Sequence, residues 1–206
     1  MDERSLEHMQ AAIAIIKKYA PKMQISMAGN YHPEIEKDLS DYCVDLMSPT
    51  QYSPEVVDRR RSEGKISTYY TCCSSPHLNT FTFSPLDDAS FIPWYALKKG
   101  YNGYLRWAYN SWTIDPIYDS RFRAWSSGDT YIVYPENYPS LRWQKLVEGI
   151  QQFEKYKQLK AKAERTGDRQ LTNALSELFE SIDLSRVPKL DGHPDELKER
   201  LNKLSK

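Results

Sequence analysis

Residues 66–109 decide the fold of this chain, with the sequence ISTYYTCCSSPHLNTFTFSPLDDASFIPWYALKKGYNGYLRWAY. Ile66–Thr71 is rich in β-branched and aromatic residues, which is typical of a strand. A helix is predicted over Asp88–Lys99, because Gly100 supplies the stop signal that follows many helices. Gly103–Tyr109 is the next predicted strand. A strand, a helix and a second strand in this order form the pattern of a parallel βα unit.

The same alternation runs through the residues that precede this stretch. In chain order, the sequence predicts a helix from Ser5 through Tyr19, a strand over Gln24–Ala28, a helix over Pro33–Leu39, a strand over Tyr42–Met47 and a helix from Ser53-Pro54 to Gly64. Helix and strand therefore alternate four times, and right-handed crossovers are expected. Four such units, with a further helix starting at Pro139-Ser140, make half of an eight-fold barrel or a small doubly wound sheet.

Residues 144–206 differ in kind from the rest of the chain. They contain a long predicted helix over Gln144–Thr166, an amphipathic helix over Leu171–Ile182 and a short charged helix over Asp195–Ser205. We therefore expect half-barrel βα units with aromatic strand-end loops over residues 1–143, and a helical C-terminal extension over residues 144–206. The extension is expected to pack on the outside of the barrel or to support an assembly.

Charge and hydropathy exclude several classes of protein. The chain has 206 residues, with 28 Lys and Arg against 28 Asp and Glu, so its formal net charge is zero. The sequence lacks the basic excess that would indicate a nucleic-acid binder or a polybasic membrane anchor. The mean hydropathy is −0.71, and no run approaches the roughly 18 apolar residues of a membrane span. Met1 is followed at once by Asp2-Glu3-Arg4, so no signal peptide is expected.

Motifs for cofactors and metals are missing from the sequence. No GxGxxG or GxxxxGK[ST] loop follows a predicted strand, which argues against dinucleotide or NTP binding. The four His residues are far apart and lack the spacing of zinc ligands. The three Cys residues are an odd number and imply no disulfide framework. We therefore expect neither a cofactor nor a metal ion.

Aromatic residues and carboxylates gather at the predicted strand ends, where sites lie in parallel α/β folds. The chain has 5 Trp, 15 Tyr and 6 Phe, and such rings suit the faces of sugars as well as protein cores. The candidates are Asp2 and Glu3 before the first helix, then Asn30 with His32, Gln51 with Tyr52, Tyr69-Tyr70, and Trp107, Tyr109, Asn110 and Trp112. Carboxylates, amides and aromatic rings are the composition of a carbohydrate site.

Five stretches occur in the order that is seen in one enzyme family. They are Asp2-Glu3 followed by Arg4-Ser5, KISTYYTC over Lys65–Cys72, GYNGYLRWAYNSW over Gly100–Trp112, GDTYIVYP over Gly128–Pro135, and Ser140-Leu141-Arg142 with Glu148-Gly149-Ile150. Together they resemble the C-terminal half of the catalytic domain of glycoside hydrolase family 123, the β-N-acetylgalactosaminidase type. The resemblance spans roughly residues 1–160. Arg4 stands where the family usually has Pro, and Thr130 where it has Gly.

The resemblance implies a TIM-like (β/α)8 barrel, of which this chain supplies the C-terminal half, and a retaining, substrate-assisted hydrolysis of terminal β-linked N-acetylgalactosamine. In this scheme Asp2 orients the substrate's acetamido group and Glu3 is the general acid. Taken without the resemblance, two acidic residues before a helix are also what the helix dipole favours.

The resemblance also supplies the residues that contact the sugar. Tyr69 or Tyr70 is expected to donate a hydrogen bond to the acetamido oxygen or to the oxazoline-like intermediate, and Trp107 and Trp112 are expected to form the pocket wall. Asn110, one of the strand-end candidates named above, completes the expected substrate-binding set together with Arg142. Arg142 has two interpretations: it clamps a sugar hydroxyl or carboxylate, or it pairs with Asp129 or caps the strand ends. Gly128-Asp129 is expected to form a turn that fixes its loop.

The family's Asp-Glu pair ends the fourth barrel strand, whereas here it opens the sequence. We therefore expect a partner for the half barrel, either a missing N-terminal half or a second copy in a homo-oligomer, because sheet edges must be covered or paired. The expected ligand is an N-acetylgalactosamine-containing glycan, with no nucleic acid and no membrane. The alternative to an enzyme is a non-catalytic carbohydrate-binding or assembly fragment of such a barrel.

Overall fold

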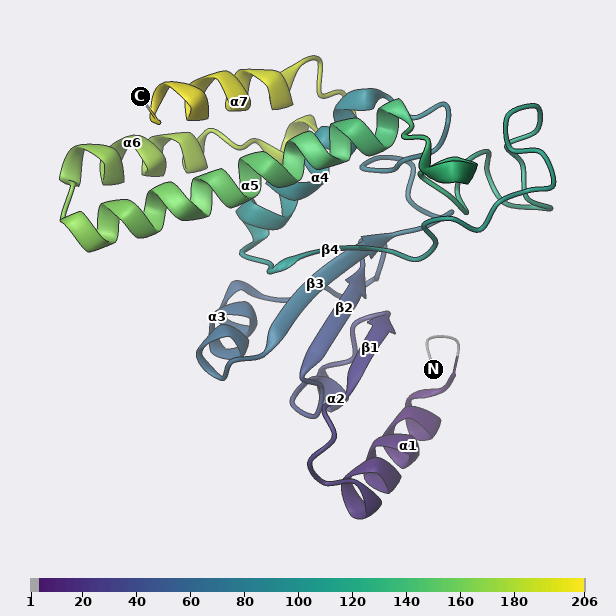
Figure 1. Cartoon of the computed structure of the whole chain (residues 1–206). Helices are drawn as coiled ribbons and strands as arrows, with labels where there is room; N and C mark the ends of the chain where they lie inside the picture. Colours follow the sequence, from purple (N-terminus) through teal and green to yellow (C-terminus); the bar gives the residue numbers. More distant parts are fainter. Residues whose placement is uncertain (1–3, 206) are drawn as a thin grey trace. The chain divides into compact units, whose positions relative to one another are not determined.

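The computed structural model describes residues 4–205 and has an α/β fold (Figure 1). Within these residues it contains four strands in one parallel sheet and seven α-helices. The chain forms two compact units, of which the first comprises residues 4–74 with 99–107 and the second residues 75–98 with 108–205. We describe each unit by itself.

The first unit is built around the parallel sheet. Its strands, in the spatial order β1-β2-β3-β4, are β1 (Ser26–Gly29), β2 (Asp41–Asp45), β3 (Ile66–Thr71) and β4 (Gly103–Arg106). Its helices are α1 (Leu6–Tyr19), α2 (Pro33–Glu36) and α3 (Pro54–Ser62). The predicted alternation of helix and strand, and the predicted parallel pairing, are both confirmed.

The register of the strands gives the sheet two faces with different chemistry. Val44 is opposite Tyr69, and Tyr69 is opposite Tyr104. Because side chains alternate along a strand, this row lies on one face and its neighbours lie on the other. We call the other side the polar face; it is formed by Asp41, Cys43, Asp45, Thr68, Tyr70 and Leu105.

A chain of tyrosines fills the core of the first unit. The ring centroids of Tyr31 and Tyr52 lie 4.9 Å apart, and those of Tyr42 and Tyr52 lie 6.0 Å apart. Tyr101 continues the contacts, because its ring lies 5.7 Å from Tyr52 and 5.9 Å from Tyr69. Burial raises the pKa of Tyr52, whose hydroxyl donates to the Tyr42 carbonyl at 2.6 Å. Much of the aromatic excess of the sequence is therefore structural.

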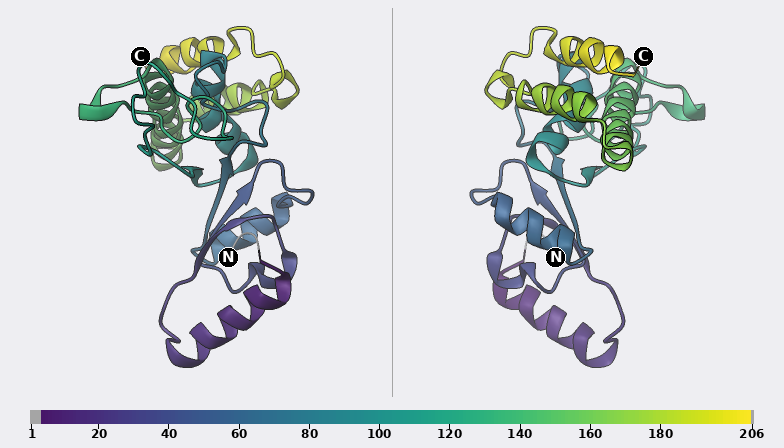
Figure 2. Two further views of the ribbon diagram at one scale, coloured as in Figure 1. Left: turned by 90° about the vertical axis from the view of Figure 1, so that its right-hand side faces the viewer. Right: turned by 90° about the vertical axis from the view of Figure 1, so that its left-hand side faces the viewer.

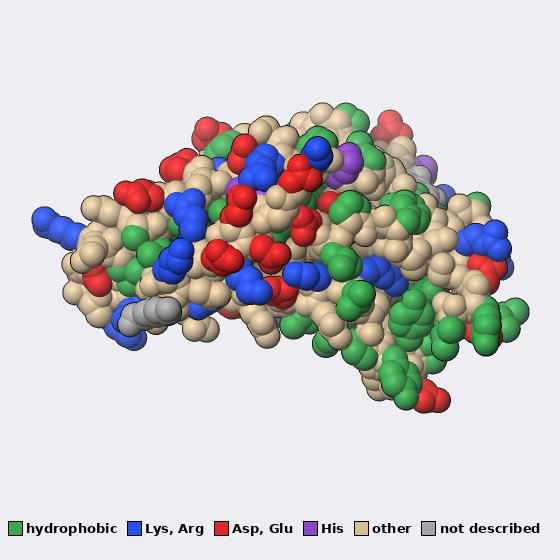
Figure 3. Space-filling view, turned by 90° about the horizontal axis from the view of Figure 1, so that it is seen from above, with side chains coloured by type: hydrophobic (Ala, Val, Ile, Leu, Met, Phe, Trp, Pro, Cys, Tyr) green, Lys and Arg blue, Asp and Glu red, His purple; other side chains and the backbone are tan. Residues whose placement is uncertain are grey.

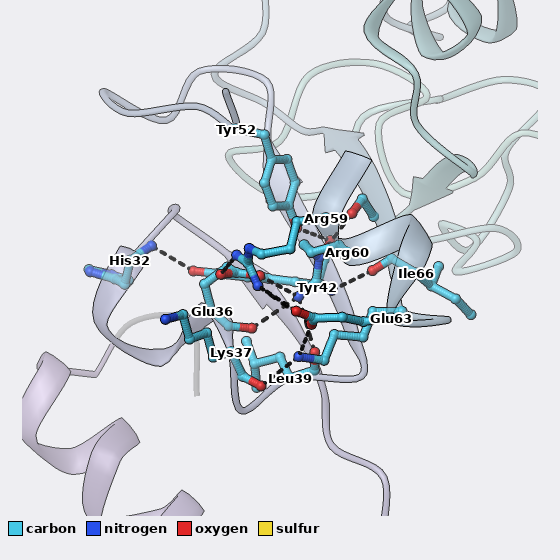
Figure 4. Close-up of polar contacts among 12 residues, drawn as sticks. His32, Glu36, Lys37, Leu39, Tyr42, Tyr52, Arg59, Arg60, Glu63 and Ile66 are labelled. Carbon is cyan, nitrogen blue, oxygen red and sulfur yellow. Dashed lines mark hydrogen bonds and ion pairs between the residues drawn. The ribbon is translucent and has the colours of Figure 1, made fainter. Parts of the chain in front are cut away.

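A buried ion-pair network ties α2, α3 and β3 together (Figure 4). The Arg60 side chain is fully buried, and its Nη1 donates to Glu36 Oε1 at 2.9 Å. Arg60 also donates to Ser67 Oγ at 2.9 Å and to the carbonyls of Glu36, Leu39 and Ile66. Arg59 forms a second ion pair with Glu36. Three adjacent basic residues, here Arg59-Arg60-Arg61, are typical of the solvated face of a helix, but Arg60 is buried.

The second unit is largely helical. Its helices are α4 (Leu86–Lys99, all but the last residue), α5 (Leu141–Thr166), α6 (Arg169–Glu180) and α7 (His193–Lys203), with short 3-10 turns at Pro135–Asn137 and Leu184–Arg186. Further views show α5, α6 and α7 lying side by side (Figure 2). Side-chain oxygens of Ser140 and Asp168 cap the first turns of α5 and α6.

The C-terminal helices pack on α4. The Gly192 N–H donates to Asp87 Oδ2 at 2.7 Å, and Lys98 Nζ donates to the Phe179 carbonyl at 3.0 Å. The Lys98 ammonium also lies 4.5 Å from the centre of the Phe179 ring. These contacts hold C-terminal segments at the two ends of α4, which is buried along most of its length.

Gly149 marks the closest approach of α5 to α4. A Cβ atom at this position would lie 2.4 Å from the Ser90 carbonyl oxygen and 2.9 Å from Pro93 Cδ. We predict that Gly149→Ala lowers the free energy of unfolding by about 2–3 kcal/mol, because overpacking forces two helices apart. Gly103→Ala is the matched control, since nothing lies within 4 Å of its added Cβ. Urea denaturation measures both, and equal stabilities would contradict the close approach.

Several boundaries differ from the predicted ones. The predicted helix at 139–140 and the predicted helix over Gln144–Thr166 are one helix, α5, because no residue between them interrupts it. β4 ends at Arg106, opposite the last residue of β3, so the predicted extension to Tyr109 has no partner strand. α2 ends at Glu36, and the next residues turn through tighter bonds from Asp38 N–H and Leu39 N–H.

Two predictions about the architecture stay predictions. A parallel four-stranded sheet is consistent with part of a barrel, but closure into an eight-stranded TIM barrel involves strands that these residues do not supply. The division of the chain after residue 143 is also untested. None of the helices within residues 4–205 is long and apolar enough to cross a membrane.

Candidate functional site

The predicted catalytic pair, Asp2 and Glu3, lies outside the described residues. The helix that follows the pair is confirmed, because α1 begins at Leu6 and Ser5 caps it. Ser5 Oγ accepts a hydrogen bond from the His8 N–H at 3.4 Å. The catalytic roles of Asp2 and Glu3 remain predictions.

The structure separates the two adjacent tyrosines of β3. Tyr69 is 0% exposed, and its ring packs 5.9 Å from Tyr101 and 5.2 Å from Tyr104. Tyr70 lies on the polar face, opposite Asp45 on one side and Leu105 on the other. Tyr69 therefore belongs to the tyrosine core, whereas Tyr70 shares its face with a carboxylate.

Burial keeps the hydroxyl of Tyr104, whose ring packs on Tyr69, in its neutral form. Removal from water raises the pKa of Tyr104, because the phenolate is the charged form. Its hydroxyl lies 2.7 Å from Thr71 Oγ1. Tyr104 thus stays a neutral hydroxyl that links β4 to the end of β3.

Asp45 is the last residue of β2, at the carboxyl edge of the sheet, and sequence reasoning missed it. Its side chain is half-buried on the polar face. Oδ1 accepts the Met47 N–H at 2.9 Å, and Oδ2 lies 3.8 Å from Cys72 Sγ. The strand predicted from the sequence extends to Met47, so Asp45 does not appear as the last residue of the strand. An acidic residue at the end of a parallel strand is the signal that indicates it.

The other predicted strand-end pairs, Asn30 with His32 and Gln51 with Tyr52, lie in loops that are held by hydrogen bonds between side chains and backbone. Gln51 Nε2 donates to the carbonyls of Asp45 at 2.8 Å and Ser48 at 3.2 Å, so it fixes the turn after β2. The Tyr42 hydroxyl donates to the Asn30 carbonyl at 2.5 Å and accepts the His32 N–H at 2.8 Å. These bonds hold the loops after β1 and β2 at the carboxyl edge.

Trp107 directly follows β4, and its side chain is 40% exposed. The preceding residue is held at the sheet, because Arg106 Nη1 donates to the Thr71 carbonyl at 3.2 Å. Tyr70 and Trp107 are therefore two predicted sugar contacts that the first unit carries at the same edge of its sheet.

Asn110 and Trp112 belong to the second unit, where a paired segment holds them. Asn110 forms an antiparallel bridge with Tyr131, and the Ile132 N–H donates to the Tyr109 carbonyl at 2.9 Å. Trp112 Nε1 donates to the Val133 carbonyl at 2.8 Å, while the residue stays 36% exposed. The bond fixes the edge of the indole and leaves ring surface accessible.

Arg142 has contacts that favour its structural interpretation. Its side chain is buried, and Nη1 donates to the carbonyls of Thr80 and Gly128, the latter at 2.8 Å. Its guanidinium lies 5.4 Å from the centre of the Tyr131 ring. Gly128 has a φ of 74°, and an added Cβ there would lie 2.6 Å from Arg142 Nη1. The turn at Gly128 thus makes room for Arg142, whose contact with a sugar remains a prediction.

Exposed apolar side chains gather on the loops of the second unit. Figure 3 shows charges of both signs interspersed over the helices and hydrophobic side chains at the right, where the 108–138 loops lie in Figure 1. Ile114 and Tyr118 are 107% and 88% exposed, and Ile117 is 78% exposed. These loops therefore offer aromatic and aliphatic surface next to Trp112 in the sequence.

Features for other chemistries are few in the described chain. Within residues 4–205, no group of three His, Cys, Asp or Glu side chains is arranged to hold a metal ion. A shallow groove on α5 is lined by Lys155, Lys162 and Arg165, with no aromatic residue. Its composition does not fit a sugar site. The carboxyl edge of the sheet is thus the best candidate in the first unit.

Comparisons with known proteins agree with this composition. The glycoside hydrolase 123 catalytic-domain family matches residues 1–159. A family 123 glycoside hydrolase from Clostridium perfringens, whose structure was analysed for glycolipid glycan hydrolysis, superposes with a TM-score of 0.83 at 23% sequence identity. The match covers 99% of this chain and 40% of that chain, so this chain spans less than half of that protein's length. Among curated proteins, none matches this chain.

Proposed function

We propose that this chain, which belongs to the glycoside hydrolase 123 catalytic-domain family, supplies the catalytic residues of an enzyme that cleaves terminal β-linked N-acetylgalactosamine. The family match over residues 1–159 carries the proposal, because it includes Asp2, Glu3 and all four strands. The structural neighbour adds support through the shared fold. A glycolipid glycan is one substrate to test, since that neighbour was studied with such glycans.

The proposed reaction uses the substrate's own acetamido group as the nucleophile. Its carbonyl oxygen attacks C1 while the bond from C1 to the leaving oxygen breaks, and Glu3 gives its proton to that oxygen. Asp2 accepts the acetamido N–H and stabilises the positive charge of the cyclic intermediate. Water then attacks C1, the Glu3 carboxylate takes its proton, and the ring reopens. Two inversions at C1 give retention.

The aromatic residues that we propose as sugar contacts differ in exposure. Tyr70 is a better candidate than Tyr69 to donate to the acetamido oxygen, because it is 7% exposed on the face that carries Asp45, whereas Tyr69 is 0% exposed in the tyrosine core. Trp107 and Trp112 keep ring surface exposed for a sugar face. Asn110 supplies an amide on the same segment as Trp112.

A chromogenic assay tests the proposed function. The protein is expected to release 4-nitrophenol from 4-nitrophenyl N-acetyl-β-D-galactosaminide and not from the α-linked isomer, because only the β-linked leaving group lies opposite the attacking acetamido oxygen. A thiazoline analogue of N-acetylgalactosamine is expected to inhibit competitively, since it mimics the cyclic intermediate. Binding of the sugar without any turnover would instead support the non-catalytic module.

Tyr70→Phe and Tyr69→Phe separate the two tyrosines in the same assay. Loss of the Tyr70 hydroxyl is expected to lower kcat/KM about 10-fold or more, the scale of one hydrogen bond that strengthens in the transition state. The same change at Tyr69 removes a hydroxyl from the core and is expected to lower stability without a comparable loss of kcat/KM. The reverse pattern would reassign the acetamido contact to Tyr69.

A further inference from the structure

The polar face of the sheet carries two carboxylates on one strand, and they lie at opposite edges. Asp41 begins β2 and Asp45 ends it. They share a face because they are four positions apart in the strand, and their Cα atoms are about 13 Å apart at the rise of a strand. Ligand sites in parallel sheets lie at the carboxyl edge, so only Asp45 of the two occupies such a position.

The hydrogen bonds of the two carboxylates also distinguish Asp45 from Asp41. Asp41 accepts from two hydroxyls of the chain, Ser26 Oγ at 3.1 Å and Thr68 Oγ1 at 3.5 Å. Asp45 uses Oδ1 for the Met47 N–H, while its Oδ2 lies 3.8 Å from the Cys72 thiol. A thiol is a weak donor, so Oδ2 keeps capacity for a stronger one.

Charge and position fit a neutral, hydroxyl-bearing ligand. Within residues 4–205, no Lys or Arg forms an ion pair with Asp45. The bond from the Met47 N–H fixes the carboxylate plane before a ligand arrives, which limits the entropy lost on binding. Tyr70 is opposite Asp45 on the next strand, about 4.8 Å away at the usual strand spacing.

We propose that Asp45 is a substrate-positioning residue whose Oδ2 accepts a hydrogen bond from a ring or exocyclic hydroxyl of the bound aminosugar. This inference rests on the proposed function, because it assigns the hydroxyl to the sugar whose acetamido group Tyr70 contacts. A carboxylate that binds a sugar hydroxyl forms a charge-assisted hydrogen bond, which is stronger than one between neutral groups. It orients the sugar ring relative to the neighbouring tyrosine.

Asp45→Asn separates binding from structure. The amide oxygen of Asn still accepts the Met47 N–H, so the turn after β2 is retained and the melting temperature stays within a few degrees. The loss of charge at Oδ2 is expected to lower kcat/KM for 4-nitrophenyl N-acetyl-β-D-galactosaminide roughly 10- to 100-fold. Asp41→Asn is the matched control on the same strand and face, and it is expected to leave kcat/KM within about 2-fold.

Deoxy substrates identify the hydroxyl. This test compares kcat/KM of Asp45→Asn and of the parent protein on the 3-, 4- and 6-deoxy aryl glycosides. The two proteins are expected to differ on the two substrates that keep the contacted hydroxyl. They are expected to have the same kcat/KM on the one that lacks it. Equal losses in Asp45→Asn and Asp41→Asn, or equal losses across the three deoxy substrates, would overturn the assignment.

The failure of this inference is distinguishable from the failure of the proposed function. Turnover by the parent with an unaffected Asp45→Asn variant overturns the role of Asp45 alone. Calorimetry measures the binding of free N-acetylgalactosamine. Binding that is weakened by Asp45→Asn but not by Asp41→Asn supports the role of Asp45, even if the protein shows no turnover. A parent protein that neither binds nor hydrolyses the sugar overturns both.

Discussion

Glu3→Gln is expected to lower kcat for an N-acetyl-β-galactosaminide about 10²- to 10⁴-fold, the usual contribution of a general acid–base group. The amide keeps the size of the side chain but has no proton to give to the leaving oxygen. The loss should be larger for a natural disaccharide than for a 4-nitrophenyl glycoside, because 4-nitrophenolate leaves readily without protonation. Steady-state kinetics with the two substrates measure the difference.

Glu7→Gln is the matched control for this variant. Glu7 lies in the first turn of α1 and is exposed, so its loss should leave kcat within about 2-fold. Equal activities of Glu3→Gln and the parent protein would remove Glu3 from the mechanism. An equal loss in Glu7→Gln would point to a general effect on α1 instead.

Arg60→Met is expected to lower the free energy of unfolding by about 3–5 kcal/mol, the cost of breaking a buried ion pair by removing one partner. Met fills much of the space but donates no hydrogen bond. Glu36 Oε1 loses its 2.9 Å contact, and the carbonyls of Leu39 and Ile66 lose their donor. Urea denaturation followed by circular dichroism measures the change.

Arg61→Met tests whether burial is the cause. The Arg61 side chain is 53% exposed, pairs with Asp58, whose side chain is 72% exposed, and donates an exposed hydrogen bond to the Gly100 carbonyl at 2.6 Å, so its loss should cost about 1 kcal/mol. The double variant Glu36→Leu with Arg60→Met should be less destabilised than the two single losses together, because both single variants lose the same ion pair. A cost for Arg60→Met as small as that for Arg61→Met would contradict the network in Figure 4.

The sequence predicts the order of the elements well, because local signals set most of them. Ser5 and Ser53 cap α1 and α3, Gly100 ends the region of α4, and the β-branched run over Ile66–Thr71 forms β3 as expected. Pro54 stands at the first turn of α3, where its missing N–H has no consequence. Such signals depend only on neighbours in the chain.

The features that the sequence does not predict depend on partners distant in the chain. Arg60 reads as one of three adjacent basic residues, and only the arrival of Glu36 and Ser67 shows that it is buried. Tyr69 and Tyr70 look equivalent until the register with Val44 and Asp45 assigns them to opposite faces. Asp45 becomes a candidate only once the end of the ladder is known.

The anomeric form of the first product tests the central claim most directly. Proton NMR during the first minutes of reaction, before mutarotation, reports the configuration at C1 of the released sugar. Substrate-assisted cleavage of a β-linked glycan with retention predicts β-N-acetylgalactosamine, followed later by the α anomer. Appearance of the α anomer first, or release of no N-acetylgalactosamine from any β-linked substrate, would contradict the account.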